Sequence, residues 1–300
     1  MQNYKFNYSI IIPHKNSPEL LAICLNSIPK RDDIQIIIID DNSDNIDFDD
    51  FPGTGEKNIN IYFTKEGKGA GYARNYGLEK ALGRWVLFVD ADDFLIENSF
   101  ENVIDKYINS QADIVYFGAT SIYLNTYQEA NRHNYITSIL NSYKEECLET
   151  HDYLKYNFVN PVCKLMRLDF IKGHKIKFDE VKYGNDVMFS IIAAYHSTKI
   201  EVIKTPIYCI TYSQGTLVTK TNKESVYCRY IVNMRRNAFL KEIGKSQYQR
   251  SIIYSLFTAF KLSPLFCFRL FLLGIKNNAN FLAGKDRWWN TTKSLIFRRK

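Results

Sequence analysis

This 300-residue sequence has little of what secreted, zinc-binding or membrane-spanning proteins need. Its 6 cysteines are scattered, without a C-x-x-C pair or a regular spacing. This pattern argues against a disulfide framework or a zinc site and favours a reducing compartment. The first apolar run, Ile10 to Ile12, is too short for a signal peptide and stops at Pro13. No stretch offers the roughly 18 uncharged apolar residues that a spanning helix needs, so we expect a cytoplasmic protein without one.

Acidic residues are scarce toward the C-terminus. Residues 222–300 carry 16 Lys/Arg against 3 Asp/Glu, a net charge of +13. The overall charge of +7 therefore leaves −6 (7 − 13) on residues 1–221. Such asymmetry indicates that the C-terminal segment faces an anionic partner. The composition, 46% hydrophobic and 24% charged, is otherwise that of a globular protein.

Short apolar segments alternate with helical patterns in the first part of the chain. Strands are predicted at Ser9–Ile12, Ile34–Ile39, Asn58–Phe63, Trp85–Val89 and Asp113–Phe117, with helices at 17–28, 70–82 and 97–109. The β-branched run Ile34–Ile39 is typical of a strand buried on both faces of a parallel sheet. The alternation predicts an α/β fold with a mostly parallel sheet and flanking helices.

The pattern weakens after Gly118. Residues 123–143 are expected to form irregular strands or a loop, followed by a helix from near Asp186 to about His196 and strands at 199–203 and 206–210. From residue 222 onward the pattern is helical, with candidates at 223–243, 247–262 and 265–276. We therefore divide the chain into an α/β domain, residues 1–221, and a basic, aromatic-rich helical region, residues 222–300.

Polar clusters follow three of the predicted strands, where ligands bind in open α/β sheets. They are His14-Lys15-Asn16, Asp40-Asp41 and Asp90-Ala91-Asp92-Asp93. Neighbouring carboxylates repel one another and are costly to bury, unless a cation lies among them. A divalent cation bridging to phosphate oxygens would meet this need. The alternative is a solvated acidic turn that caps the next helix, and for Asp93 a helix cap is the role we expect.

The glycine-rich loop Gly67-x-Gly69-x-Gly71 matches neither of the familiar phosphate loops. A P-loop needs Ser or Thr after Gly-Lys, and a dinucleotide loop follows the first strand rather than the third. The loop begins a helix that carries Arg74 and Asn75. The planar guanidinium of Arg74 is predicted either to bind a diphosphate or to pair with an aspartate at the sheet end.

Three runs in this order resemble glycosyltransferase family 2, which has the GT-A fold: S-I-I-I-P-H-K-N, I-I-I-I-D-D-N-S-D and G-A-G-Y-A-R-N-Y-G-L-E-K-A-L-G-R-W-V-L-F-V-D-A-D-D. The resemblance covers residues 7–118 and resumes at 161–189 with N-P-V-C-K-L-M-R and G-N-D-V-M-F. It implies a nucleotide-binding half at about 1–118 and an acceptor half at about 119–221.

The resemblance also implies roles for individual residues. Pro13 and Asp41 would hold the nucleobase, a uracil in most members, and Arg74 would lie by the base and phosphates. The wall of the nucleotide-sugar site would be Asp90-Ala91-Asp92, with Asp90 on the ribose or donor sugar and Asp92 on Mg²⁺ or Mn²⁺ bound to the diphosphate. Asp186 would be the general base. From the residues alone, the favoured interpretation of Asp186 is a helix N-terminal carboxylate that stabilises the dipole, and the resemblance is what favours the base.

The sequence departs from the family pattern at three places. Asn185 stands where the family usually has Glu, so one carboxylate remains there, and Lys15 replaces an aromatic of the first motif. The segment 208–216 resembles a lid that often contains Arg or His, and here it contains neither. Closure over the diphosphate would then depend on Lys164, Tyr212 or Ser213.

The resemblance implies an inverting, metal-dependent glycosyltransferase that moves a sugar from a UDP-sugar to a saccharide or polyprenyl-linked acceptor. Similar bacterial members build capsules, O-antigens and other surface polysaccharides. A sugar nucleotidyltransferase is one alternative, although it usually has a basic glycine-rich loop after the first strand. A non-catalytic nucleotide- or membrane-binding protein of the same fold is another.

The basic C-terminal region has two main interpretations. Its helices would pack against the catalytic domain, or they would attach the protein to the anionic inner face of the cell membrane. The two arrangements are compatible. Nucleic acid is the weaker candidate partner, because no nucleic-acid motif is present.

Overall fold

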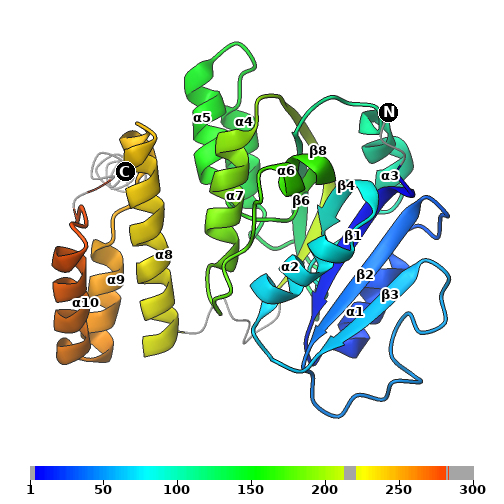
Figure 1. Ribbon diagram of the computed structural model, residues 1–300, viewed down its shortest axis with the longest axis horizontal. Coiled ribbons are helices and arrows are strands. Elements are labelled where there is room, and N and C mark those ends of the chain that lie inside the picture. Colours follow the sequence, from blue (N-terminus) through cyan, green and yellow to red (C-terminus); the bar gives the residue numbers. More distant parts are fainter. Residues whose placement is uncertain (1–3, 213–220, 282, 284–300) are drawn as a thin grey trace. The chain divides into compact units, whose positions relative to one another are not determined.

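The computed structural model describes residues 4–212, 221–281 and 283. The chain forms two compact units, Met1–Thr216 and Leu217–Lys300. The first unit contains the sheet and the second contains helices, which Figure 1 shows in the colours of the sequence.

The first unit is built on one eight-stranded sheet with the order β3-β2-β1-β4-β7-β6-β8-β5. Strands β3, β2, β1 and β4 are parallel, β7 is antiparallel to both of its neighbours, and β6 is parallel to β8. The strands are β1 (Phe6–His14), β2 (Ile34–Asp41), β3 (Ile59–Thr64), β4 (Gly83–Phe88), β5 (Phe94–Leu95), β6 (Ile114–Tyr123), β7 (Lys164–Arg167) and β8 (Ile200–Tyr212). The predicted α/β class with a mostly parallel sheet is confirmed.

The central strands owe their position to runs of isoleucine. Every residue of β2 is buried, and Ile10, Ile11 and Ile12 of β1 are completely inaccessible. Burying one such side chain stabilises the fold by about 1.5–3 kcal/mol. These strands are therefore rigid, and the polar residues at their carboxyl ends are held in fixed positions.

The helices of the first unit connect and cover the strands. They are α1 (Pro18–Asn26), α2 (Ala70–Lys80), α3 (Ser99–Asn102), η1 (Ile104–Tyr107), α4 (Asn134–Ser142), α5 (Leu148–Asn157), α6 (Leu168–Gly173) and α7 (Asn185–His196). Helix α2 lies against β1 and β2, so its glycine-rich start reaches the carboxyl ends of these strands (Figure 1).

Three sequence predictions of elements are wrong. Residues 123–143 contain α4, because Ile136, Ile139 and Leu140 form a buried helical stripe within a polar, aromatic run. The helix predicted at 97–109 is interrupted at Val103, whose φ of −128° separates α3 from η1. The two strands predicted at 199–210 are one strand, β8, whose pairing with β6 shifts register at Gly118.

The second unit contains α8 (Lys223–Glu242), η2 (Ser246–Tyr248), α9 (Ile253–Leu262) and α10 (Pro264–Lys276). Asn222 caps α8 in a reciprocal capping box with Ser225. The predicted helix at 247–262 begins later, at Ile253, because the 3₁₀ turn Ser246–Tyr248 ends at Gln249, whose backbone is extended. Among the described residues, no helix combines the length and apolarity needed to cross a membrane.

Candidate active site

The acidic turn Asp90–Asp93 follows β4 at the carboxyl edge of the sheet. Ligand oxygens of Asp90, Asp92 and Asp93 all lie within 4.8 Å of one another. Burial raises the pKa of Asp92 and of Asp93, and the neighbouring carboxylates raise both pKa values further. The arrangement disfavours the charged forms unless a cation compensates them.

Asp93 has a structural role that differs from the predicted helix cap. The hydroxyl of Tyr208 donates to its Oδ2 at 2.9 Å, and the backbone N–H of Thr211 donates to its Oδ1 at 2.7 Å. The same hydroxyl accepts from the backbone N–H of Asp90 at 3.0 Å. The cap prediction is wrong because the short strand β5, and no helix, follows Asp93. Asp93 instead fastens the acidic turn to β8.

Arg74 of α2 connects the acidic turn to the start of α7. Its Nη2 donates to Asp90 Oδ1 at 2.5 Å, and its Nη1 donates to Asn185 Oδ1 at 2.9 Å. The guanidinium also lies 5.4 Å from the centre of the Phe178 ring. Of the two predictions made for Arg74, the ion pair with an aspartate is therefore present. Asn185, where the family usually has Glu, accepts a hydrogen bond from the same guanidinium.

Two further residues of α2 fix the segment that leads into α7. The side chain of Asn75 donates to the carbonyl of Phe178 at 3.0 Å and accepts from its N–H at 2.8 Å. A Cβ at Gly71 would lie 2.1 Å from the carbonyl oxygen of Asp179, so only glycine permits this approach. Residues in the first half of the chain thereby determine where Asp186 begins its helix. Sequence patterns gave no signal of this contact.

Asp186 lies in the first turn of α7, after Gly184 with its left-handed φ of 77°. Burial raises the pKa of Asp186, and Asp90 raises it further, whereas Arg74 and Lys164 lower it. Burial is the largest effect, so the pKa stays above its ordinary value of 3.8. A carboxylate with a raised pKa is a better proton acceptor, which suits general base catalysis.

Lys164 lies in the sheet rather than on a loop. Its Nζ donates to the carbonyl of Phe158 at 2.7 Å, and its charge lies 4.8 Å from the centre of the Phe158 ring. Burial lowers the pKa of Lys164 to about 7. This engagement gives no support to the suggested diphosphate contact. Of the other two candidates, Tyr212 ends β8, and Ser213 lies outside the described residues.

The ends of β1 and β2 form the second part of the site. Pro13 pairs with Ile39 in the parallel register, and Asp41 ends β2. The backbone N–H of Gly69 donates to Asp41 Oδ2 at 2.8 Å, and Lys15 Nζ donates to the carbonyl of Asp41 at 2.9 Å. Among the described residues, the buried Oδ1 of Asp41 has no hydrogen-bond partner. Such an oxygen is costly unless a ligand donates to it.

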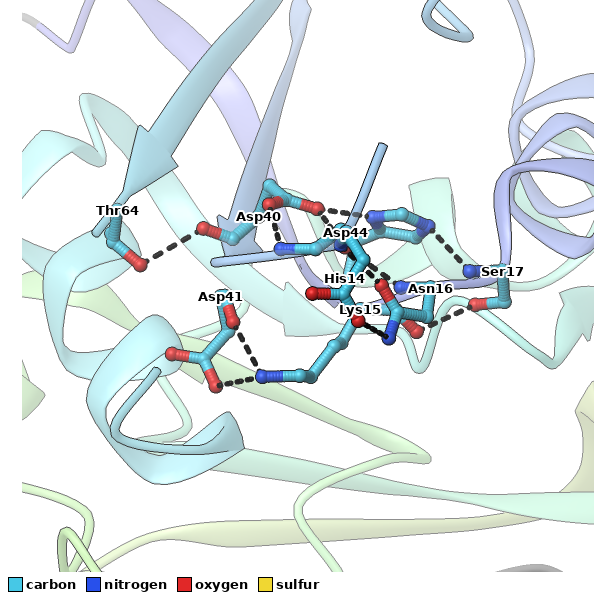
Figure 2. A network of polar contacts seen from close by, with 9 residues as sticks. His14, Lys15, Asn16, Ser17, Asp40, Asp41, Asp44 and Thr64 are labelled. Atoms are coloured by element: carbon cyan, nitrogen blue, oxygen red, sulfur yellow. Dashed lines mark hydrogen bonds and ion pairs between the residues drawn. The ribbon is translucent and has the colours of Figure 1, made fainter. Parts of the chain in front are cut away.

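His14 and Asp40 hold these strand ends in place (Figure 2). Nδ1 of His14 lies 2.7 Å from Asp40 Oδ2, and the backbone N–H of Ser17 donates to Nε2 at 3.2 Å. These partners assign a neutral ring that carries its proton on Nδ1. Burial acts to raise the pKa of Asp40, but hydrogen bonds from His14 and Ser43 outweigh it and lower the pKa. We assign the pair a structural role.

Comparison with known proteins identifies the family. Residues 9–174 match the model of glycosyl transferase family 2. The chain belongs to glycosyl transferase family 2. It is therefore a glycosyltransferase, as the sequence motifs predicted. The glycosyltransferase EpsH of Bacillus subtilis is 24% identical over 257 residues, which cover 81% of this chain and 71% of EpsH.

A second similar protein is the poly(ribitol-phosphate) β-N-acetylglucosaminyltransferase TarS of Staphylococcus aureus. It is 24% identical over 253 residues, which cover 80% of this chain and 42% of TarS. A crystal structure of TarS in complex with UDP-GlcNAc aligns with a TM-score of 0.62 at 20% sequence identity. The alignment covers 84% of this chain and 73% of that one. This similarity confirms the predicted GT-A fold.

Proposed function

We propose that the protein transfers a sugar from a UDP-sugar to a hydroxyl group of a saccharide or polyprenyl-linked saccharide, with inversion at the anomeric carbon. The product would be a precursor of a bacterial surface polymer, such as a capsule, O-antigen or teichoic acid. One observation carries the proposal: Arg74 joins the acidic turn of the nucleotide-binding half to the start of α7, where Asp186 lies.

The unpartnered Oδ1 of Asp41 supports a uracil-containing donor. Because Gly69 already donates to Oδ2, the remaining oxygen is the one that lacks a donor, and the N3–H of uracil would supply one. Pro13 lies on the neighbouring strand, and we propose that its backbone contacts the nucleobase. TarS is described in complex with UDP-GlcNAc, so UDP-GlcNAc is the first donor to test.

The acidic turn fits Mg²⁺ or Mn²⁺, because hard cations prefer carboxylate oxygens. Asp92 is the first ligand we assign, since no other described residue donates a hydrogen bond to its carboxylate. Asp90 accepts a hydrogen bond from Arg74 through Oδ1, which leaves Oδ2 as its candidate metal ligand, whereas both oxygens of Asp93 accept hydrogen bonds. Ala91 between them is buried and shapes the turn. When bound, the ion would neutralise the charge that develops on the departing diphosphate.

On the acceptor side, Asp186 takes the proton of the attacking hydroxyl. The hydroxyl oxygen forms a bond to the anomeric carbon from the face opposite the diphosphate, the bond from carbon to phosphate oxygen breaks, and UDP leaves with the electron pair. A single displacement of this kind inverts the configuration. General base catalysis contributes about 10²–10⁴-fold to such a step.

We place this reaction at the inner face of the cell membrane. A polyprenyl-linked acceptor resides in the membrane, and the C-terminal unit is strongly basic. Anionic lipids attract such a surface. The enzyme would bind there peripherally, with no nucleic acid as a partner.

A donor screen tests the proposal. The protein is incubated with a panel of UDP-sugars and Mn²⁺ or Mg²⁺, and released UDP is measured with and without chelator. We expect slow release of UDP from one donor, its loss on chelation, and its loss in Asp92→Ala but not in the matched control Asp32→Ala, an exposed site. Release of pyrophosphate in a parallel incubation with UTP and a sugar 1-phosphate would indicate a nucleotidyltransferase, and donor binding without any turnover would indicate a non-catalytic protein.

A further inference from the structure

Helices α9 and α10 each expose a stripe of large apolar side chains. In α9, Tyr254 is 81% exposed and Phe257 is 66% exposed, and Phe260 continues the stripe. In α10, Leu265 is 60% exposed and Phe268 is 56% exposed. The residues recur every three or four positions, which places them on one face of each helix. We call the following set the docking face: Tyr254, Phe257, Phe260, Leu265, Phe268, Phe271, Leu272 and Ile275.

The opposite faces of these helices already form the core of the second unit. Ala259 of α9 and Leu270 of α10 are buried with Tyr230 of α8. The hydroxyl of Tyr230 donates to the carbonyl of Leu270 at 2.9 Å, and Gly274 leaves room for its ring. The residues of the docking face lie outside this core, and of them Phe271 contacts the ring of Phe281 at its edge. Large apolar side chains that gather on the exposed faces of two packed helices mark a site of interaction.

The charges around the docking face are all of one sign. Residues 243–285 contain no Asp or Glu. Each of three cations lies four residues, or about one turn, after an exposed apolar residue: Lys261 after Phe257, Arg269 after Leu265 and Lys276 after Leu272. Long basic side chains at such positions can lie along apolar surface and extend their charge to a polar boundary.

We propose that the docking face inserts into an anionic lipid bilayer, with α9 and α10 lying in the plane of the membrane surface. The 13 residues of α10 span about 20 Å, which is too short for a hydrocarbon core of about 30 Å. The aromatic and aliphatic side chains would enter the acyl boundary, and Lys261, Arg269 and Lys276 would contact anionic headgroups. A second copy of this chain fits less well, because a two-fold contact would bring the same cations together.

The proposal specifies how the proposed enzyme reaches its acceptor. It rests on the proposed function only for the identity of that acceptor, since vesicle binding needs neither donor nor catalysis. An in-plane hairpin would hold the second unit at the headgroup level, where a polyprenyl-linked saccharide presents its hydroxyl groups.

The test measures sedimentation of the full chain with vesicles of phosphatidylglycerol and phosphatidylcholine, and with phosphatidylcholine alone. We expect binding to the anionic vesicles and a loss of about tenfold or more in Phe257→Ser/Phe268→Ser, because two inserted rings are removed. Lys261→Gln/Arg269→Gln should weaken binding to anionic vesicles by about fivefold for each charge and leave the remaining binding less sensitive to salt. Tyr227→Ser, an exposed aromatic of α8, is the matched control and should bind as the wild type does.

Thermal unfolding and UDP release in solution are measured on the same variants. Unchanged values would show that the substitutions act on membrane binding alone. Equal vesicle binding by wild type and Phe257→Ser/Phe268→Ser would overturn the proposal. So would a dimer, detected by light scattering, that dissociates in this variant while vesicles bind neither protein. Vesicle binding by a protein with no transferase activity would contradict the proposed function and leave this inference standing.

Discussion

Asp93 is buried, Asp92 and Asp186 are half-buried, and each has a raised pKa for which removal from water is the largest cause. Asp93 is compensated by hydrogen bonds from Tyr208 and Thr211. Asp186 is compensated by the nearby charges of Arg74 and Lys164. The charges of Arg132 and Arg74 act to lower the pKa of Asp92, but among the described residues no other residue donates a hydrogen bond to its carboxylate, which is why we propose it as the ligand of the metal ion. We therefore propose that Asp93 anchors the acidic turn, that Asp186 acts as the base and that Asp92 binds the metal ion.

Transfer should depend on pH through Asp186. Its raised pKa means that the ionised base forms only as the pH rises through that value, so kcat should increase with pH along the acidic limb. Below pH 7 the ammonium of Lys164, whose pKa is about 7, lowers the pKa of Asp186. Lys164→Met should therefore move the acidic limb of the kcat profile to higher pH.

Lys172→Met is the control, because Lys172 is an exposed lysine whose Nζ also donates to a backbone carbonyl, that of Ala81. Its profile should follow the wild type. A limb that moves to lower pH in Lys164→Met would contradict the electrostatic account.

Asp41 should determine the choice of nucleobase. In Asp41→Asn, the side-chain oxygen is needed to accept from Gly69, so the new amide N–H₂ takes the position of Oδ1. A donor there opposes the N3–H of uracil but matches the N3 acceptor of cytosine. We expect UDP affinity to fall by about tenfold or more, as an unpaired buried polar group costs about 1–3 kcal/mol, while CDP gains relative to UDP.

Calorimetric titration of UDP and CDP measures this change, with Asp44→Asn in the neighbouring exposed loop as the control. If the ratio of the UDP and CDP affinities did not change, Asp41 would not contact the nucleobase.

At the scale of elements, the sequence best predicts those helices and strands whose own residues show a clear pattern. The run Ile34–Ile39 alone specifies a doubly buried strand, and β2 is buried throughout. Helix α4 was not predicted, because polar and aromatic residues lie between Ile136, Ile139 and Leu140 and obscure the helical period. The carboxyl-edge polar clusters were predictable because parallel strands end together.

Contacts between distant segments were beyond such patterns. Tyr208 meets Asp93 across 115 residues, and Arg74 meets Asn185 across 111. Neither contact has a local signature, since both depend on the sheet order β4-β7-β6-β8 rather than on spacing. The role of Asp93 was misjudged for this reason. The replacement of the family's usual Glu by Asn185 was visible in the sequence, whereas the hydrogen bond between Asn185 and Arg74 was not.

The close packing of α2 against the segment before α7 should be sensitive to one methyl group. In Gly71→Ala, the added Cβ would meet the carbonyl oxygen of Asp179 at 2.1 Å, a contact that backbone must relieve by moving. Overpacking of this kind costs about 1–3 kcal/mol. We expect a lower melting temperature and a loss of transfer, because Asp186 follows this segment.

Gly173→Ala is the control, since a Cβ there meets nothing within 4 Å. Thermal unfolding and UDP release are compared for the two variants. A Gly71→Ala protein with wild-type stability and turnover would show that the close contact between Gly71 and Asp179 is not required.

At the scale of the whole molecule, the proposed donor site and the proposed base lie in different halves of the first unit. The proposed donor site comprises the ends of β1, β2 and β4, and the proposed base lies on α7, which Arg74 connects to the acidic turn. The second unit adds a basic, apolar surface suited to lipid. The account therefore predicts that the functions can be separated by substitution.

The most direct test of the central claim is a comparison of donor binding and sugar transfer in Asp186→Asn. This substitution keeps the shape of the side chain and removes its ability to accept a proton. The account predicts UDP-sugar affinity within about twofold of the wild type and a transfer rate lower by about 10²–10⁴-fold. Loss of donor binding together with transfer, or transfer at the wild-type rate, would contradict the assignment of Asp186 as the base.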